Sequence, residues 1–333
     1  MASQSSSRKV IYAALLGNFL IAVTKFAAAA WTGSSAMLSE GVHSLVDTGN
    51  ELLLLYGLHR SALPPDRAHP LGHGRELYFW TFIVSLLIFA LGAGVSIYEG
   101  IMHMREPEPV ESPVVNYVVL GLSFLFEGGS WWVALKEFRR AKGQRGYYQA
   151  VRESKDPTTF TVLFEDSAAL AGLVIAFVGI SAAQYFEIPE LDGLASVGIG
   201  LVLAATAMVL ARETKGLLIG EAAHAGLQAS ILAIAQDDPA VERANGVLTV
   251  HLAPQQIVAA LSAEFADDLT TPEIEACVTR LEAKVKAAHP EIAMLFIKPQ
   301  SAGTYRKRRA AINLADYTVD DSGHLLKDAP DSP

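Results

Sequence analysis

Six long apolar segments restrict the fold of this chain more than any other feature of the sequence. A membrane-spanning helix needs about 20 consecutive, mostly apolar residues. Segments of this kind follow one another at about residues 10–30, 36–58, 77–100, 113–136, 159–182 and 191–213 of the 333-residue chain. Hydrophobic residues make up 51% of the sequence, which is above the usual fraction for a soluble protein. The sequence therefore predicts a mainly α membrane protein, with a six-helix transmembrane domain over residues 1–213.

The first apolar segment has to be distinguished from a cleavable signal peptide. Arg8 and Lys9 precede an apolar run that ends in "FAAAAW", and such small residues are typical of a cleavage site. Lys25 interrupts the run, which is also longer than the apolar core of a signal peptide. We therefore expect an uncleaved spanning helix here.

Basic residues are concentrated in the loops on one side of the predicted membrane. They are Arg8, Lys9, Arg60, Arg67, Arg75, Lys136, Arg139, Arg140, Lys142, Arg145, Arg152 and Lys155. On the other side, the only basic loop residue is Arg105. Since cytoplasmic loops carry an excess of Lys and Arg, both termini are predicted to be cytoplasmic. No targeting segment is recognised, so a bacterial inner membrane is the expected location, with an organellar inner membrane as the alternative.

The pattern changes after about residue 214. One amphipathic helix, two strands joined by a turn, a second helix and a last strand are predicted in this order. Their ranges are 221–241, 244–254, 255–267, 271–290 and 292–299. The order is typical of a small α+β domain of the split-βαβ kind, expected over residues 214–300. Residues 301–333 are polar and are predicted to be a disordered tail.

Three ionisable residues lie on one stripe of the second apolar segment. Glu40, His43 and Asp47 in "SEGVHSLVD" are spaced i, i+3 and i+7, so they share a helix face. An ionisable residue at the middle of a bilayer costs about 2.5–3.5 kcal/mol. His43 and Asp47 could offer a nitrogen and an oxygen to one metal ion. The alternative is a hydrogen-bonding cluster that only holds helices together.

The fifth apolar segment supplies two more acids. Glu165 and Asp166 lie in "VLFEDSAAL" and are candidates for the second half of a metal site. The alternative places them at a helix end near the cytoplasmic interface, because Lys155 and Pro157 lie only about ten residues upstream.

The predicted loop between the second and third spans contains "DRAHPLGHGRE". Asp66, His69 and His73 provide a carboxylate and two imidazoles, which are common zinc ligands. The alternative is a basic turn that fixes the start of the third span. The sequence favours neither interpretation.

Composition excludes other classes of site. The single cysteine, Cys277, allows neither a disulfide framework nor a thiolate zinc site. The net charge of -9 argues against nucleic-acid binding. No His-Glu-x-x-His arrangement of an intramembrane metalloenzyme occurs, so no enzymatic activity is expected.

Four motifs together resemble the cation diffusion facilitator family over about residues 8–300. They are "SEGVHSLVDTGNELLLLYG", "DRAHPLGHGRE", "EDSAALAGLVIA" and "LDGLASVGIG". The resemblance implies a homodimeric antiporter that exports divalent metal ions, most commonly Zn²⁺, from the cytoplasm in exchange for protons. It also implies a cytoplasmic ferredoxin-like domain and a zinc ion in the loop of some members.

The resemblance implies a transport site made of one residue pair on the second span and one on the fifth, each pair four residues apart. His43 and Asp47 are the first pair. Asp166 matches the family aspartate because Gly172 follows it by six residues, but Val162 stands where the family has His or Asp.

The fourth ligand therefore remains open. Glu165, Glu40 and water are the candidates, and similarity to a family subgroup with Glu-Asp at this point favours Glu165. Without the histidine, manganese, iron or cobalt are alternatives to zinc, because oxygen-rich sites accept them. A metal sensor or scaffold without transport is a further alternative.

One further acid, Glu127, and three histidines after residue 214 are expected to have structural roles. Glu127 in "FLFEGGSW" is either a proton relay or a protonated, hydrogen-bonded acid, and the second is favoured. His224, His251 and His289 are scattered over the C-terminal domain, so this domain is predicted to serve dimerisation, with weak or absent metal binding.

Overall fold

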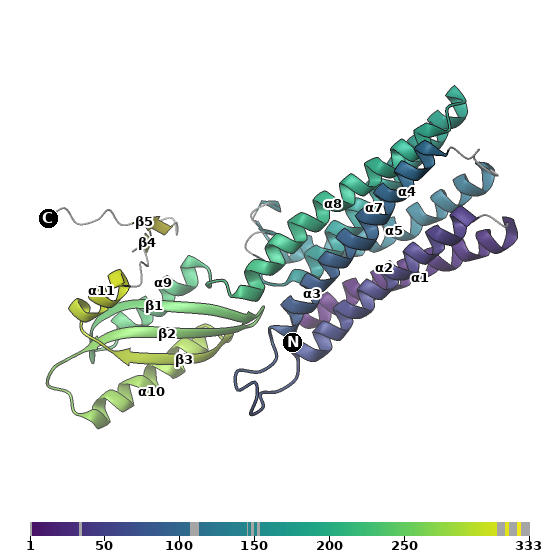
Figure 1. Cartoon of the computed structure of the whole chain (residues 1–333). Helices are drawn as coiled ribbons and strands as arrows, with labels where there is room; N and C mark the ends of the chain where they lie inside the picture. The colour runs from purple at the N-terminus through teal and green to yellow at the C-terminus, as the bar shows by residue number, and fades with distance from the viewer. Residues whose placement is uncertain are drawn as a thin grey trace. The chain divides into compact units, whose positions relative to one another are not determined.

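The computed structural model shows a chain of two compact units (Figure 1). It describes residues 2–32, 35–106, 113–144, 146–147, 150–151, 154–311, 317–319 and 325–327. The first unit covers Met1–Leu218 and the second covers Ile219–Pro333.

Long helices that run beside one another make up the first unit (Figure 1). In chain order they are α1 (Ala2–Thr32), α2 (Ser35–Ser61), α3 (Glu76–Leu87), η1 (Ile88–Ala93), α4 (Gly94–Arg105), α5 (Pro113–Lys142), α7 (Pro157–Phe186) and α8 (Glu190–Ile219). The π-helical segment η1 joins α3 and α4 into one continuous rod over Glu76–Arg105. Helix α1 packs on α2 and α5, and α5 packs on α7.

Five stretches of the described helices are long and apolar enough to cross a membrane. They are Ser7–Ala28, Glu76–Arg105, Val114–Lys142, Pro157–Phe186 and Glu190–Ile219. The prediction of a helical, multi-pass membrane protein is thus confirmed. Helix α2 is not among the five, and it carries Asp47 and Glu51 within its length. Its role as a sixth span stays a prediction.

The start of α7 is fixed by local sequence. Asp156 is the N-cap residue, and its Oδ1 accepts a hydrogen bond from the Thr158 amide at 3.2 Å. Pro157 at the first helical position suits the helix because its missing N–H would have had no partner there. Asp156 Oδ2 also accepts a hydrogen bond from Ser7 Oγ of α1 at 2.5 Å. These contacts fix the start of α7 and join it to α1, and the acids Glu165 and Asp166 follow about two and a half turns later.

Glycines allow α4 and α8 to approach closely. A Cβ atom added to Gly193 would lie 2.7 Å from the Gly100 carbonyl oxygen, and one added to Gly100 would lie 2.7 Å from the Gly193 carbonyl oxygen. Small residues at such crossings let two membrane helices gain van der Waals contact along their backbones. The rod over Glu76–Arg105 is therefore tightly joined to α8.

The second unit contains a three-stranded sheet with two helices packed against it. Its elements are α9 (Ala225–Gln236), β1 (Val241–Ala253), β2 (Gln256–Phe265), α10 (Thr271–Ala288) and β3 (Ile292–Pro299). The strand order is β1-β2-β3, with β1 and β2 antiparallel and β2 and β3 parallel. Buried residues of β2 pack with those of α9 and α10 in one core. This order of helices and strands is the one the sequence predicts.

The chain after residue 300 differs from the predicted disordered tail. Helix α11 (Ala302–Ala311) follows β3, and the short strands β4 (Tyr317–Val319) and β5 (Leu325–Lys327) pair antiparallel. The Ala302 amide donates to the Glu264 carboxylate at 3.1 Å, and Tyr305 lies directly over Gly246 of β1. The absence of a side chain at Gly246 makes room for the tyrosine, a tertiary contact that composition does not reveal.

Asp238 is the centre of a polar network in the second unit. Its side chain is 1% exposed, and its Oδ1 accepts hydrogen bonds from Arg280 Nη2 at 3.0 Å and from the Ala240 amide at 3.2 Å. The Cys277 thiol donates to the same oxygen at 3.4 Å. The hydrogen bond from Arg280 is the main cause that lowers the pKa of Asp238 to about 2. The charged carboxylate thus connects the turn before β1 to α10.

The glycine crossing predicts a position-specific loss of stability. Gly100→Ala should lower the free energy of unfolding by about 1–3 kcal/mol, because the added methyl group overlaps the α8 backbone. The measurement is the thermal midpoint of the full chain in detergent. Gly121→Ala is the matched control, because a Cβ atom there meets no atom within 4 Å. Equal midpoints for the two variants would contradict the close crossing.

Asp238 predicts an acid-sensitive second unit. Because the folded-state pKa is about 2, below the ordinary value of 3.8, the contribution of Asp238 to stability is present above about pH 4 and lost as pH falls toward 2. Asp238→Asn should lower the stability of this unit by about 1–3 kcal/mol at pH 5. Amide hydrogen-exchange protection of β2, corrected for intrinsic rates, measures both effects. Asp237→Asn, an exposed neighbour, should behave as wild type, and equal loss in both variants would disprove the assignment.

Candidate metal transport site

Helix α2 carries a buried polar stripe along the bundle. Ser44, Thr48, Asn50 and Glu51 are all buried, and Glu51 has no exposed surface at all. Asp47, on the same stripe, is partly exposed. The backbone of His43 lies in α2, but its side chain lies outside the part that the structure describes. Of the predicted His43–Asp47 pair, only the side chain of Asp47 can therefore be located in the structure.

Helix α7 holds the two predicted acids inside the bundle. Glu165 is 7% exposed and Asp166 is 1% exposed. The Ser130 hydroxyl of α5 donates to Asp166 Oδ2 at 2.7 Å, and the Asn50 amide of α2 donates to Glu165 Oε1 at 3.5 Å. Because both side chains are buried, they do not lie at a solvated helix end, which was the alternative interpretation of these acids.

Five carboxylates from three helices gather in this part of the first unit. They are Asp47 and Glu51 of α2, Glu127 of α5, and Glu165 and Asp166 of α7. All are close enough for their charges to interact, and charges in a low-dielectric interior repel strongly unless a cation or protons offset them. The charge of Asp47 on α2 thus acts on those of Glu165 and Asp166 on α7. Their role as metal ligands stays a prediction.

Val162 leaves one side of the cluster without a ligand atom. It lies one turn before Asp166 and is fully buried. Its apolar side chain cannot replace the histidine or aspartate that the family pattern has there. Glu165 is buried and directly precedes Asp166. Of the acids on α7, it is the one nearest in sequence to Val162.

Lys25 of α1 adds a cation close to the carboxylates. It is 9% exposed, and its Nζ donates to Ser44 Oγ of α2 at 2.9 Å. Its charge also interacts with that of Glu127. A buried lysine beside acids lowers the net negative charge that a metal ion or protons must offset.

Three residues that were not predicted from the sequence lie beside the predicted ligands. These residues are Asn50, Glu51 and Ser130, from α2 and α5. A signal existed for Glu51, because it continues the i, i+4 spacing of His43 and Asp47 by one further turn. No such signal existed for Ser130, whose position depends on how α5 packs on α7.

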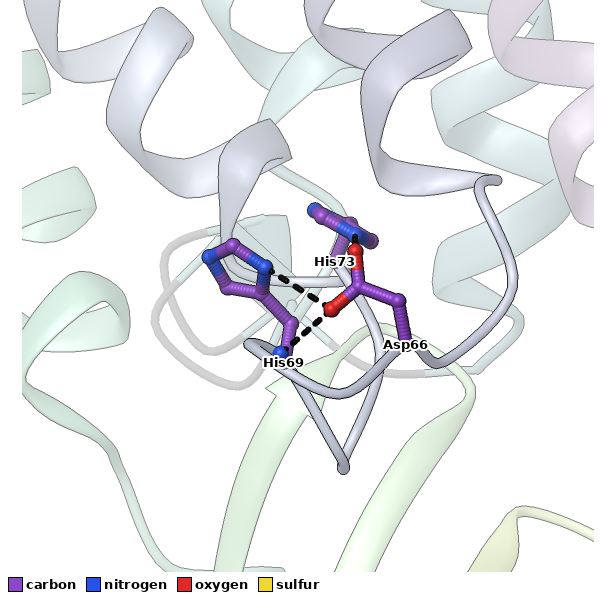
Figure 2. A group of neighbouring side chains, drawn as sticks. All are labelled: Asp66, His69 and His73. Atoms are coloured by element: carbon purple, nitrogen blue, oxygen red, sulfur yellow. Dashed lines mark hydrogen bonds and ion pairs between the residues drawn. The ribbon is translucent and has the colours of Figure 1, made fainter.

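The loop after α2 forms a second, separate cluster (Figure 2). Its ligand atoms, from Asp66, His69 and His73, all lie within 4.8 Å of one another. Asp66 Oδ1 lies 3.3 Å from His69 Nδ1, and Asp66 Oδ2 lies 3.2 Å from His73 Nε2, so the carboxylate lies between the two rings. The His69 amide donates to Asp66 Oδ1 at 2.6 Å and is the main cause that lowers the pKa of Asp66. Two imidazoles and an ionised carboxylate fit the ligand set of zinc.

The start of α3 is held both by this cluster and by other residues, since the Glu76 amide donates to the His73 carbonyl oxygen at 2.9 Å. Arg60 at the end of α2 forms an ion pair with Glu76 at 2.8 Å, and Trp80 donates to Glu76 Oε2 at 2.8 Å. These contacts join α2 to α3, and the carbonyl groups of His69 and His73 accept hydrogen bonds within the same turn. The metal site therefore stays a prediction beside the interpretation of a basic turn.

The loop cluster predicts zinc binding that depends on both imidazoles. His69→Ala or His73→Ala should lower the loop affinity for zinc at least tenfold, because each removes one of three protein ligands. Isothermal titration with Zn²⁺ is done in an Asp47→Asn, Glu51→Gln, Asp166→Asn background, which weakens binding by the buried acids. His59→Ala, at an exposed position near the end of α2, is the control. Unchanged affinity in both loop variants would show that the cluster only shapes the turn.

Comparisons with known proteins agree with this arrangement. Residues 11–219 match the family model described as the cation efflux transmembrane domain. The chain is 35% identical over 251 residues to the protein named proton-coupled zinc antiporter SLC30A9, mitochondrial, of Xenopus laevis, covering 75% of this chain and 45% of the relative. It is 34% identical over 241 residues to metal tolerance protein C4 of Arabidopsis thaliana, covering 71% of this chain and 52% of the relative.

A bacterial relative aligns over more of its own length. The chain is 24% identical over 287 residues to the cation-efflux pump FieF of Shigella flexneri serotype 5b (strain 8401), covering 85% of this chain and 89% of the relative. By contrast, the chain spans about half the length of the first two relatives.

The helical bundle with its buried carboxylates defines a multi-pass integral membrane protein of the transporter class. The chain belongs to the cation efflux family, also called the cation diffusion facilitators. The resemblance inferred from the four sequence motifs is therefore confirmed.

Proposed function

We propose that this protein exports divalent metal ions, Zn²⁺ first, from the cytoplasm in exchange for protons by alternating access. The observation that carries the proposal is the burial of Glu165 and Asp166 on α7, whose charges interact with that of the partly exposed Asp47 on α2. Relatives named as a proton-coupled zinc antiporter and a cation-efflux pump support it. The protein acts as a transporter and not as an enzyme.

The buried acids couple the metal ion to protons. Isolated ionised carboxylates inside a membrane are costly, so each must be offset by a metal ion, a proton or a neighbouring cation. Metal ions bind deprotonated carboxylates and neutral imidazole, so loading the site releases protons. When the site faces the other side, protons replace the metal ion. The net charge inside the bundle then stays low through the whole cycle.

His43, Asp47 and Asp166 are the proposed metal ligands, with Glu165 as the fourth. Glu165 is the candidate favoured by geometry because it is buried within the same carboxylate cluster. A set with one imidazole and three carboxylates accepts Mn²⁺, Fe²⁺ or Co²⁺ as well as Zn²⁺, so transport of these ions is the alternative.

The arrangement in the membrane follows the same proposal. Helix α2 also spans the membrane, which brings the number of spans to six, and both termini are cytoplasmic. The domain over residues 214–300 is a cytoplasmic ferredoxin-like domain that joins two copies into a homodimer. Leu248, Met294 and Phe296 are exposed on the sheet and supply apolar surface for such a contact. The bacterial inner membrane is the proposed location, with a mitochondrial membrane as the alternative that one relative's name supports.

The histidines of the second unit have local structural roles. His224 caps α9 by accepting a hydrogen bond from the Leu227 amide at 3.1 Å. His289 Nε2 lies 2.8 Å from Ser230 Oγ, and His251 Nδ1 lies 3.3 Å from the Ala253 carbonyl. Each of these histidines thus has a local hydrogen-bond partner of its own, and dimerisation is the role that we propose for this domain.

Metal uptake into proteoliposomes with an imposed pH gradient tests the proposed function. Wild type should take up Zn²⁺, and Asp47→Ala and Asp166→Ala should each lower the rate at least a hundredfold, because each removes a charged ligand. Running Mn²⁺, Fe²⁺ and Co²⁺ beside Zn²⁺ ranks the ions. Asp267→Ala, an exposed acid of the second unit, is the control.

Two results would contradict the proposal. Folded wild-type protein that transports none of the four ions would favour the alternative of a metal sensor or scaffold. Uptake that is independent of the pH gradient would contradict proton exchange, while the proposal of metal transport would stand.

A further inference from the structure

One helical turn from the proposed transport ligands, α2 and α7 carry a second group of oxygen atoms. Five buried atoms form no hydrogen bond with any described part of the chain: Asn50 Oδ1, Glu51 Oε1, Glu51 Oε2, Thr161 Oγ1 and Glu165 Oε2. Asn50 is 1% exposed, and Glu51 and Thr161 are fully buried. Buried polar atoms in folded proteins almost always have a partner, so such a group needs a physical explanation.

One hydrogen bond, one charge interaction and the helix spacing connect these residues across α2 and α7. The Asn50 amide donates to Glu165 Oε1 at 3.5 Å, which ties α2 to α7 at this level. Among the charges that act on Glu51, that of Glu165 has the largest effect. Thr161 lies four residues before Glu165 and therefore on the same face of α7. The four residues form one group, which we name the Glu51 cluster.

The direction of both helices sets this group apart from the transport ligands. Glu51 lies four residues after Asp47, nearer to the end of α2 that leads into the 66–73 loop. Thr161 lies five residues before Asp166, nearer to the start of α7. The hydroxyl of Tyr78 near the start of α3 donates to the Lys155 carbonyl at 3.2 Å, so these helix ends lie together. The Glu51 cluster is thus located between the transport ligands and that end of the bundle.

The chemistry of the group matches a hard divalent cation. It offers two carboxylates, one amide oxygen and one hydroxyl, with no nitrogen or sulfur ligand. Oxygen-only sets of this kind suit Mn²⁺, Mg²⁺ and Ca²⁺ better than a tetrahedral zinc ion. Two negative charges would neutralise one divalent cation, and the cation would satisfy the oxygen atoms that lack donors.

We propose that Asn50, Glu51, Thr161 and Glu165 form a second, oxygen-only binding site for a divalent metal ion, through which cargo passes on its way to or from the transport ligands. The inference rests on the proposed function for the path of the ion. The binding of the ion itself is a separate claim. Glu165 belongs to both sites, so the two are adjacent stations for one ion and not two resident metals.

Mn²⁺ binding to the full chain in detergent tests the site, because electron paramagnetic resonance distinguishes free from bound Mn²⁺. The background carries Asp47→Asn, Asp166→Asn, His69→Ala and His73→Ala, which removes two of the four proposed transport ligands and both histidines of the loop cluster. We expect one Mn²⁺ bound per chain in this background. Glu51→Gln should weaken that binding at least tenfold, because it removes a charge while preserving shape. Glu190→Gln, on the exposed start of α8, is the matched control and should leave binding unchanged.

A second variant keeps the test valid if Glu51→Gln alters folding. Thr161→Val preserves the volume of the side chain and removes only its oxygen, so weaker Mn²⁺ binding in this variant supports the site. Absence of Mn²⁺ binding in the background, or binding unchanged in folded Glu51→Gln, would overturn the inference.

Transport in proteoliposomes separates this inference from the proposed function. In the otherwise wild-type chain, Glu51→Gln should lower Mn²⁺ uptake at limiting ion concentration at least fivefold. Wild-type uptake that does not change in Glu51→Gln overturns the station on the path while the proposed function stands. If Mn²⁺ binding depends on Glu51 but the chain transports no ion, the binding site is supported and only the proposed transport function is contradicted.

Discussion

Burial of carboxylates among apolar helices is the constraint on which the rest of this structure depends. Asp166 is almost completely enclosed, with a single described hydrogen bond from Ser130, and Glu51 is enclosed with none. Water offers both groups a far better environment than a helix bundle does. The fold keeps them inside because α2, α5 and α7 bury large apolar surfaces around them. Their burial becomes favourable once cations or protons offset the charge.

The first unit uses different forces in different places. The rod over Glu76–Arg105 meets α8 through glycines, where close backbone contact needs no polar partner. By contrast, α1, α2, α5 and α7 meet through serine, asparagine, lysine and acidic side chains as well as apolar ones. Hydrogen bonds between membrane helices contribute modestly to stability. The polar contacts of this half are therefore better explained by the proposed binding of an ion than by the stability of the bundle.

Much of this arrangement follows from the sequence alone, since apolar length defines spanning helices and i, i+4 spacing defines helix faces. Asp47, Glu165 and Asp166 could be predicted in this way. Glu51 is harder to identify because it directly precedes the leucine-rich run "LLLLYG", although it lies well inside the predicted second span. The position of Ser130 opposite Asp166 and that of Tyr305 over Gly246 depend on contacts between segments far apart in the sequence. Periodicity within one segment carries no information about such contacts.

Ligand chemistry changes along the proposed path of the ion, and the order has a physical meaning. The loop cluster offers imidazole nitrogen with one carboxylate, and the Glu51 cluster offers oxygen only. The proposed set of transport ligands combines both. An ion moves through consecutive sites only if each binds well enough for the ion to enter and weakly enough for it to leave. Hard oxygen ligands hold zinc less tightly than imidazole does. A weaker station beside the transport ligands would therefore let zinc move on, whereas a second histidine at Val162 would bind it more firmly.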